Sequence, residues 1–213
     1  MLAAVLLALA PPQTESLELF RGASVPGTPG YRYWAVEDTY LDPAKPDAGF
    51  GGLGKVSAGN GKVMLIKFGD LTRVIGPARR IVSAKLVLSL QAPGKPALKS
   101  VSKVMAPWGE GPILTLVKAI SQKDDEPATA GAANYKYRRA GKEPASWQIS
   151  GAKGAQDAQP VQGTKLSAGA EGEVVIEGLG PEVQRMAERW YDNFGLAITF
   201  DGTADFLSSQ APV

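Results

Sequence analysis

Glycine and proline interrupt this sequence along its whole length. The 213 residues include 25 glycines and 16 prolines, and both residue types are unfavourable inside helices. Long helices therefore have little room, whereas short strands separated by turns fit between the interruptions. Strand-like patterns lie at residues 16–20, 34–41, 62–68, 80–90, 99–105, 173–177, 195–200 and 205–209. Short strands punctuated by turns in this way predict an all-β fold, and specifically a β-sandwich.

Two of these segments indicate which faces are buried. Residues 80–90 alternate between apolar and polar side chains, which is typical of a strand with one buried face. We expect that face to carry Val82, Ala84, Leu86, Leu88 and Leu90. Residues 62–68 have apolar side chains on both faces, namely Val63 and Leu65 on one and Met64, Ile66 and Phe68 on the other. A strand buried on both sides is expected inside a sheet rather than at its edge.

Two segments depart from the strand pattern. Residues 180–193 place Val183, Met186, Ala187 and Trp190 at helical spacing, after a proline at residue 181. Proline is favoured in the first turn of a helix, so we expect one short helix lying on the sandwich. Residues 107–172 are rich in glycine, alanine and lysine and have no long strand pattern. Their length predicts an irregular insertion or a mobile functional loop rather than a plain connection.

The absence of histidine and cysteine restricts the chemistry of the chain. The sequence contains neither residue, so it lacks the commonest general base, thiol nucleophiles, disulfides and thiolate metal sites. An enzyme would need a pair of carboxylates, as in glycosidases, or Tyr and Arg, as in a polysaccharide lyase. Nothing in the sequence places such partners together, and we expect a non-catalytic protein without an organic cofactor. The net charge of +2 provides no strong field for nucleic-acid binding.

Residues 49–56, GFGGLGKV, match two nucleotide-binding patterns at once. G-x-G-x-x-G and G-x-x-x-x-G-K both require a strand before the glycines and a helix after them. Pro43 and Pro46 interrupt the segment before the glycines, and the turn sequence at residues 59–61 stands where the helix would begin. Val56 also occupies the position of the hydroxyl residue that binds magnesium. We therefore expect no nucleotide site, and a glycine-rich connection between two strands.

The N-terminal residues MLAAVLLALA form an apolar run that ends in an A-x-A-like site. This pattern resembles an export signal, although no Lys or Arg precedes it; an ordinary first strand or helix is the alternative. Residues 1–16 are therefore expected to be a signal or disordered segment, and residues 17–213 a single domain. The run is shorter than the ~20 residues that cross a bilayer, and no later segment approaches that length. We expect no membrane span.

Several short motifs after residue 16 occur in an order that resembles a known family. They are GYRYWAVEDTYLD, with Gly30, Tyr31, Asp38, Thr39 and Tyr40, followed by GFGG, MLIKFGDL, IVSAKLVLSL, PWGEG, NYKYRR, SWQISGAKGAQD and VVIEGLGPEVQRMAERWYDNFGLAI. Their order and spacing together resemble the DNRLRE-type domain, also classed as carbohydrate-binding module family 96. The motif that names the family is not present. The family also adds a further strand after the position of Ser208 and Ser209, so the alternatives are a truncated chain or a sandwich closed differently.

The resemblance implies a secreted or cell-surface protein that binds polysaccharide through a jelly-roll-like β-sandwich. The expected fold class is thus all-β, with a long irregular insertion at residues 107–172 and one short helix. The expected function is non-catalytic docking onto a polysaccharide or cell-surface glycan, acidic polymers included. A structural or adhesive surface module that contacts protein is the alternative, followed by a polysaccharide lyase or hydrolase.

Two clusters carry side chains suited to sugar binding. Aromatic rings offer flat apolar faces, and Arg or Lys can bind carboxylate and sulfate groups. The candidate ligand-binding residues are Arg32, Trp34, Tyr135, Tyr137, Arg138 and Arg139. The alternative is that these are ordinary exposed side chains without a ligand. The remaining aromatic residues at positions of the family pattern are expected to be core or loop anchors, namely Tyr31, Trp108, Trp147 and Trp190.

Three carboxylates form a candidate structural calcium site. Glu37, Asp38 and Asp42 lie close together in the sequence, and Ca²⁺ prefers oxygen ligands of this kind. No EF-hand or other calcium-loop spacing accompanies them. The alternative is that these acidic side chains cap backbone groups near turns.

Overall fold

The structure is a computed structural model that describes residues 15–76, 79–92, 94–111 and 127–209. The chain divides into two units, residues 1–34 and 35–213, and each is described by itself. In the first unit, β1 (Ala23–Ser24) and β2 (Arg32–Tyr33) form a small antiparallel hairpin. The strand predicted at residues 16–20 does not form, and the apolar run at residues 1–10 lies outside the described residues. None of the helices in the described ranges is long and apolar enough to span a membrane.

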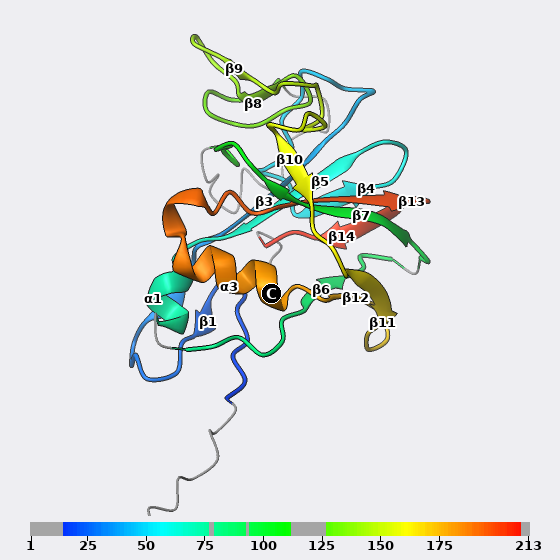
Figure 1. The fold of residues 1–213 in the computed structure, drawn as a ribbon. Coiled ribbons are helices and arrows are strands. Elements are labelled where there is room, and N and C mark those ends of the chain that lie inside the picture. Colours follow the sequence, from blue (N-terminus) through cyan, green and yellow to red (C-terminus); the bar gives the residue numbers. More distant parts are fainter. Residues whose placement is uncertain (1–14, 77–78, 93, 112–126, 210–213) are drawn as a thin grey trace, which may run out of the picture. The chain divides into compact units, whose positions relative to one another are not determined.

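The second unit is built on a five-stranded antiparallel sheet (Figure 1). Its strands, in spatial order, are β10 (Ala158–Pro160), β7 (Ala97–Val104), β13 (Leu196–Asp201), β5 (Val63–Phe68) and β3 (Val36–Leu41). β5 therefore has a neighbour on each side, as its apolar pattern predicts. Its first four residues are all buried.

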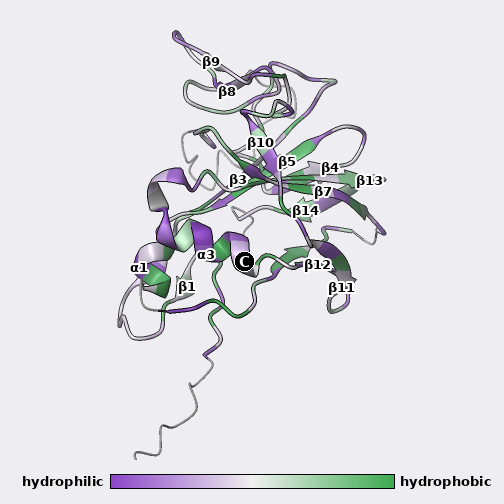
Figure 2. Cartoon of the chain, viewed as in Figure 1, coloured by the Kyte–Doolittle hydropathy of each residue, from purple (hydrophilic) through white to green (hydrophobic). Residues whose placement is uncertain are grey.

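A second set of strands faces this sheet. β11 (Lys165–Ala168), β12 (Glu173–Glu177) and β6 (Leu86–Ser89) form one ladder, and β14 (Ala204–Leu207) pairs with β4 (Lys55–Ala58). A bridge between Leu90 and Phe206 links the two ladders. Phe206 also meets Phe200 of β13, with ring centroids 5.3 Å apart, and the strands of both sheets carry many of the hydrophobic residues (Figure 2). The all-β sandwich is confirmed, and its jelly-roll connectivity stays a prediction.

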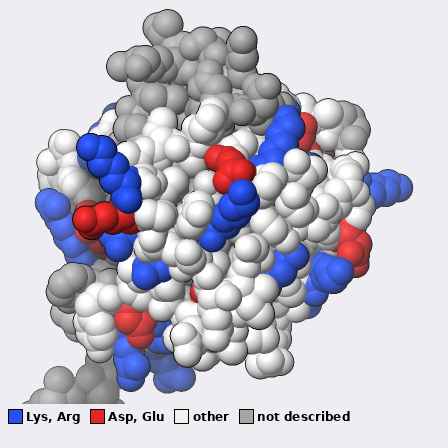
Figure 3. Space-filling model, turned by 90° about the horizontal axis from the view of Figure 1, so that it is seen from above, with Lys and Arg blue, Asp and Glu red and all other residues white. Residues whose placement is uncertain are grey.

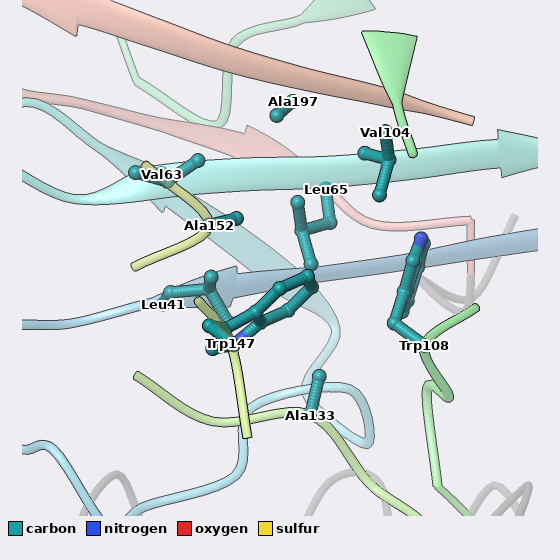
Figure 4. Close-up of a cluster of buried hydrophobic side chains, with 9 residues drawn as sticks. All are labelled: Leu41, Val63, Leu65, Val104, Trp108, Ala133, Trp147, Ala152 and Ala197. Carbon is teal, nitrogen blue, oxygen red and sulfur yellow. The ribbon is translucent and has the colours of Figure 1, made fainter. Parts of the chain in front are cut away.

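The described residues of the predicted insertion that precede β10 cover the outer face of the five-stranded sheet and form a second hydrophobic core with it. The predicted range of residues 107–172 was too long, because β10 and β11 within it are strands of the two sheets. Within residues 107–172, β8 (Tyr137–Arg139) and β9 (Ala145–Ser146) form a short hairpin, which lies on the opposite side of the sheet from β14 (Figure 1). The second core consists of Leu41, Val63, Leu65, Val104, Trp108, Ala133, Trp147, Ala152 and Ala197 (Figure 4). This packing explains why both faces of β5 are apolar: one faces the sandwich and the other faces the insertion.

The indole N–H groups tie two core tryptophans to the backbone. Trp147 Nε1 donates to the Asn134 carbonyl at 2.9 Å, and Trp108 Nε1 donates to the Phe194 carbonyl at 2.7 Å. Both side chains are buried, so their predicted role as anchors is confirmed. Tyr31 is half-buried, and the side chain of Trp190 lies outside the described ones.

The predicted helix forms, with a break near its end. α3 (Gly180–Glu188) is followed by the 3-10 turn η1 (Trp190–Asp192). Arg185 joins the two parts, because its guanidinium contacts Glu182 Oε1 at 2.5 Å and Asp192 Oδ1 at 2.6 Å. The hydrogen bonds with Glu182 and, to a smaller extent, with Asp192 raise the pKa of Arg185 above its ordinary value. A second helix, α1 (Leu71–Ile75), was not expected from the sequence; its Thr72 hydroxyl donates to the Ala187 carbonyl of α3.

One strand prediction is correct only in part. Strands lie at or near the other segments expected after residue 33, but within residues 80–90 only Leu86–Ser89 is a strand. Leu86 and Leu88 are buried as expected, whereas Val82 is 81% exposed. The reason is that the preceding residues bond to the α3 region: Ile81 N–H donates to Gln184 Oε1 at 2.7 Å, and the Ala84 carbonyl accepts from Leu179 at 3.2 Å.

Candidate functional site

Arg32 and Trp34 form an exposed pair in the first unit. Side chains alternate along an extended chain, so the buried Tyr33 between them places both on the opposite side, toward solvent. Arg32 Nη1 donates to the Gly22 carbonyl at 3.2 Å. The Trp34 ring lies 3.8 Å from the point where a side chain at Gly22 would begin. The two predicted ligand residues therefore meet at one glycine.

Gly22 makes this arrangement possible. Its φ of +89° is a conformation that side-chain-bearing residues rarely adopt. Its N–H donates to the Tyr33 carbonyl at 2.6 Å, which fixes the turn against β2. The Trp34 side chain is 65% exposed. A flat indole is thus open to solvent beside a guanidinium whose position is held by a backbone carbonyl.

The second predicted cluster is only partly available for binding. On β8, Arg138 Nη1 donates to the Pro107 carbonyl at 3.1 Å, and Arg139 is exposed. Tyr135, just before this strand, packs against the second core. Lys153 Nζ lies at the hydroxyl end of this ring, 3.1 Å from the hydroxyl and 5.4 Å from the ring centroid. Tyr137 is half-buried. The cluster therefore offers cations to a ligand more readily than it offers aromatic faces.

Some of the charged side chains near this cluster are paired with a side chain of opposite charge. Lys136 Nζ lies 2.7 Å from Asp47 Oδ2, and that hydrogen bond raises the pKa of Lys136 above its ordinary value. Figure 3, which views this side of the molecule, shows basic side chains interleaved with acidic ones. The interleaving limits the field that the surface projects, so a charged ligand would depend on close contacts with particular side chains.

The structure does not bring the predicted calcium ligands together. Glu37 pairs with Lys67, and Asp42 lies 3.6 Å from Lys62 Nζ. Asp38 accepts hydrogen bonds from the Ser208 hydroxyl and the Ser209 N–H, each at 2.6 Å. Neighbouring residues on a strand point to opposite faces, which separates Glu37 from Asp38. Within the described ranges, no group of three or more acidic residues is placed to hold a metal ion, so the structure gives the three-carboxylate site no support.

Sequence reasoning missed a carboxylate that organises the insertion. Asp157 is buried and accepts three backbone N–H groups, from Gln148 at 2.7 Å, Ile149 at 2.9 Å and Gly154 at 3.0 Å. This pattern closes the loop at residues 148–157 around one side chain. The two glycines and two alanines of the segment SGAKGAQD were the available signal, since short loops around a carboxylate need small residues.

The glycines of GFGGLGKV serve close packing. A Cβ at Gly51 would lie 2.2 Å from the Glu110 carbonyl oxygen, and one at Gly49 would lie 2.8 Å from Ala128 Cα. The segment leads into strand β4, whose first residue, Lys55, lies 3.6 Å from Asp205 Oδ2. A phosphate-binding loop would lead into a helix instead. Residues of the insertion therefore pack directly against the backbone of Gly49 and Gly51.

Comparison with models of protein families and with curated proteins found no match to this chain.

Proposed function

We propose that this protein is a non-catalytic carbohydrate-binding module of a secreted or cell-surface protein that docks onto polysaccharide. The observation that carries the proposal is the exposed Trp34 ring beside the anchored guanidinium of Arg32. Large aromatic side chains are usually buried, so a tryptophan left 65% exposed directly after β2 is suited to contact a partner. The resemblance of the sequence motifs to DNRLRE-type domains supports the same proposal.

The chemistry of the pair fits a sugar ring. The indole supplies a flat apolar face, on which the C–H groups of a pyranose can stack. Arg32 supplies N–H donors in a planar fork, which suits hydroxyl, carboxylate or sulfate oxygens. Because the Gly22 carbonyl already holds one arm of the guanidinium, less conformational entropy is lost when a ligand binds. Arg138 and Arg139 are proposed as further contacts for an acidic polymer.

Affinity electrophoresis in gels that contain acidic or neutral polysaccharides tests the proposal. We expect at least one polymer to retard the protein, and Trp34→Ala to weaken that binding by about tenfold, or ~1.4 kcal/mol. Tyr191→Ala is the matched control, because Tyr191 is also an aromatic residue and is 63% exposed. Retardation of this control should equal that of the unchanged protein.

Two results would contradict the proposal. One is that no polysaccharide retards the protein; the adhesive alternative would then be examined with protein partners. The other is that Trp34→Ala and Tyr191→Ala bind equally well, which would remove the exposed indole from the site. Release of reducing or unsaturated ends during incubation would instead indicate a hydrolase or lyase.

A further inference from the structure

The turn between β4 and β5 contains two chemical groups whose reactivity does not depend on glycan binding. The Lys62 N–H donates to the Gly59 carbonyl at 3.0 Å, which closes a two-residue turn. Asn60 and Gly61 form its tip, with φ of 53° and 78°, and both are exposed. Asn-Gly is a favoured tip for such turns because both positions require positive φ. The same pair places a side-chain amide next to an unhindered backbone nitrogen.

The local structure leaves both of these groups open to solvent. A Cβ at Gly61 would have only Pro43 Cγ nearby, at 3.5 Å, so the space around this residue is open. In the part of the chain that the structure describes, neither the Asn60 amide nor the Gly61 N–H takes part in a hydrogen bond. No hydrogen bond of either group therefore has to break before the two can react.

The other two asparagines are protected by comparison. Asn134 is buried, and its Oδ1 accepts from the N–H groups of Lys136 and Tyr137 at 2.9 and 2.7 Å. Asn193 is also buried, and its Nδ2 donates to the Phe68 carbonyl at 2.8 Å. Each is followed by an aromatic residue rather than by glycine. They are matched internal controls for the reactivity of Asn60.

We propose that Asn60 is a site of spontaneous deamidation and isoaspartate formation in the folded protein. The Gly61 nitrogen, after losing its proton to a solvent base, attacks Asn60 Cγ, and a new C–N bond forms. The Cγ–Nδ2 bond breaks, and the nitrogen leaves as ammonia after taking up a proton from water. The resulting cyclic imide is opened by one water molecule. Attack at Cγ gives aspartate, and attack at the backbone carbonyl gives isoaspartate.

The isoaspartate product would alter a tightly packed turn. The preceding Gly59 has no space for a side chain, because a Cβ there would overlap the Gly202 carbonyl oxygen. Isoaspartate adds one atom to the backbone path at the next residue, in addition to a negative charge. The Lys62–Asp42 ion pair, at 3.6 Å, lies at the end of the same turn. Deamidation would thus mark aged molecules and change the turn that leads from β4 into β5.

Peptide mapping of the folded, full-length chain tests this proposal. After ageing at mildly alkaline pH, trypsin releases residues 56–62, VSAGNGK, between Lys55 and Lys62. We expect two new forms of this peptide, each heavier by the difference between an amide and a carboxylic acid. The peptide from Asn60→Asp identifies the aspartate form, so the other is isoaspartate. Because buried asparagines react only after local opening, Asn60 should convert at least about tenfold faster than Asn134 and Asn193.

The denatured chain, aged in parallel, shows the reactivity of Asn60 without the turn. Conversion in the denatured chain but not in the folded protein would overturn the proposal, because the turn would then protect Asn60. Equal rates at Asn60, Asn134 and Asn193 in the folded protein would overturn it as well. Neither result depends on whether the protein binds a polysaccharide.

Discussion

Trp147→Ala tests whether the second core is an integral part of the fold. Trp147 belongs to the insertion and is 4% exposed, among residues contributed by β3, β5, β7 and β13. If the insertion is a loosely attached loop, removing this side chain should hardly change global stability. If the insertion and the sheet unfold together, the change should destabilise the whole second unit.

The expected magnitude follows from the buried surface. A buried aromatic side chain removes ~150–250 Å² from water, which at ~25 cal/mol per Å² corresponds to ~4–6 kcal/mol. The alanine retains part of this surface and the denatured chain is not fully extended, so we expect a loss of about 3–5 kcal/mol in the free energy of unfolding. Trp147→Phe keeps most of the packing but leaves the Asn134 carbonyl without its indole donor, at a cost of about 1–3 kcal/mol.

Urea unfolding followed by circular dichroism measures both changes. Trp34→Ala is the control, because Trp34 is exposed and its removal should change stability by no more than about 0.5 kcal/mol. A loss below about 1 kcal/mol for Trp147→Ala would refute the reasoning. So would a separate early transition in Trp147→Ala with an unchanged main transition, because the insertion would then unfold on its own.

Two further predictions concern close packing and charge. Gly51→Ala should destabilise the protein by about 1–3 kcal/mol in urea unfolding, because its Cβ would strike the Glu110 carbonyl oxygen. The control Gly94→Ala should have little effect, since its Cβ position is open. Equal losses of stability in the two variants would contradict this prediction. Hydrogen bonds from Lys165 and, to a smaller extent, from Ser167 lower the pKa of Glu177 below its ordinary value of 4.5. The stability from this pair is fully present above pH 4.5 and is lost as the pH falls through the lowered folded-state pKa. A carboxyl NMR titration of Glu177 should show that lowered pKa, and Lys165→Ala should return it toward 4.5.

The sandwich was predictable because its strands have clear periodicity. Alternation at Leu86 and Leu88 located β6, and the apolar run at residues 62–68 located β5. The same run also indicated burial on both faces, but it could not show what covers the second face. That information depends on Trp108 and Trp147, which lie in a segment without regular periodicity. Tertiary contacts at long sequence separation decide such cases, and local patterns do not contain them.

The same distinction between local sequence patterns and long-range contacts applies to the candidate site. The exposure of Arg32 and Trp34 follows from strand alternation around Tyr33, which a sequence pattern can predict. The contact of Lys153 with the Tyr135 hydroxyl depends on a loop that folds around Asp157, and local sequence patterns do not contain such a contact. Likewise, the acidic residues that are close in the sequence do not converge on one point, because each interacts with its own cationic or backbone partner. Proximity along the chain is a weak guide to a metal site when strands alternate.

The glycine-rich segment at residues 49–56 shows why a motif needs its structural surroundings. Glycine permits close backbone approach, and this property serves a phosphate in one fold and another chain segment in a different fold. Here Gly49 and Gly51 approach Ala128 and Glu110 of the insertion. Glu110 in turn accepts the N–H of Asp38, which lies on the edge strand β3, at 3.0 Å. The glycines therefore help to cover the edge strand β3, which would otherwise present unpaired backbone groups to other chains.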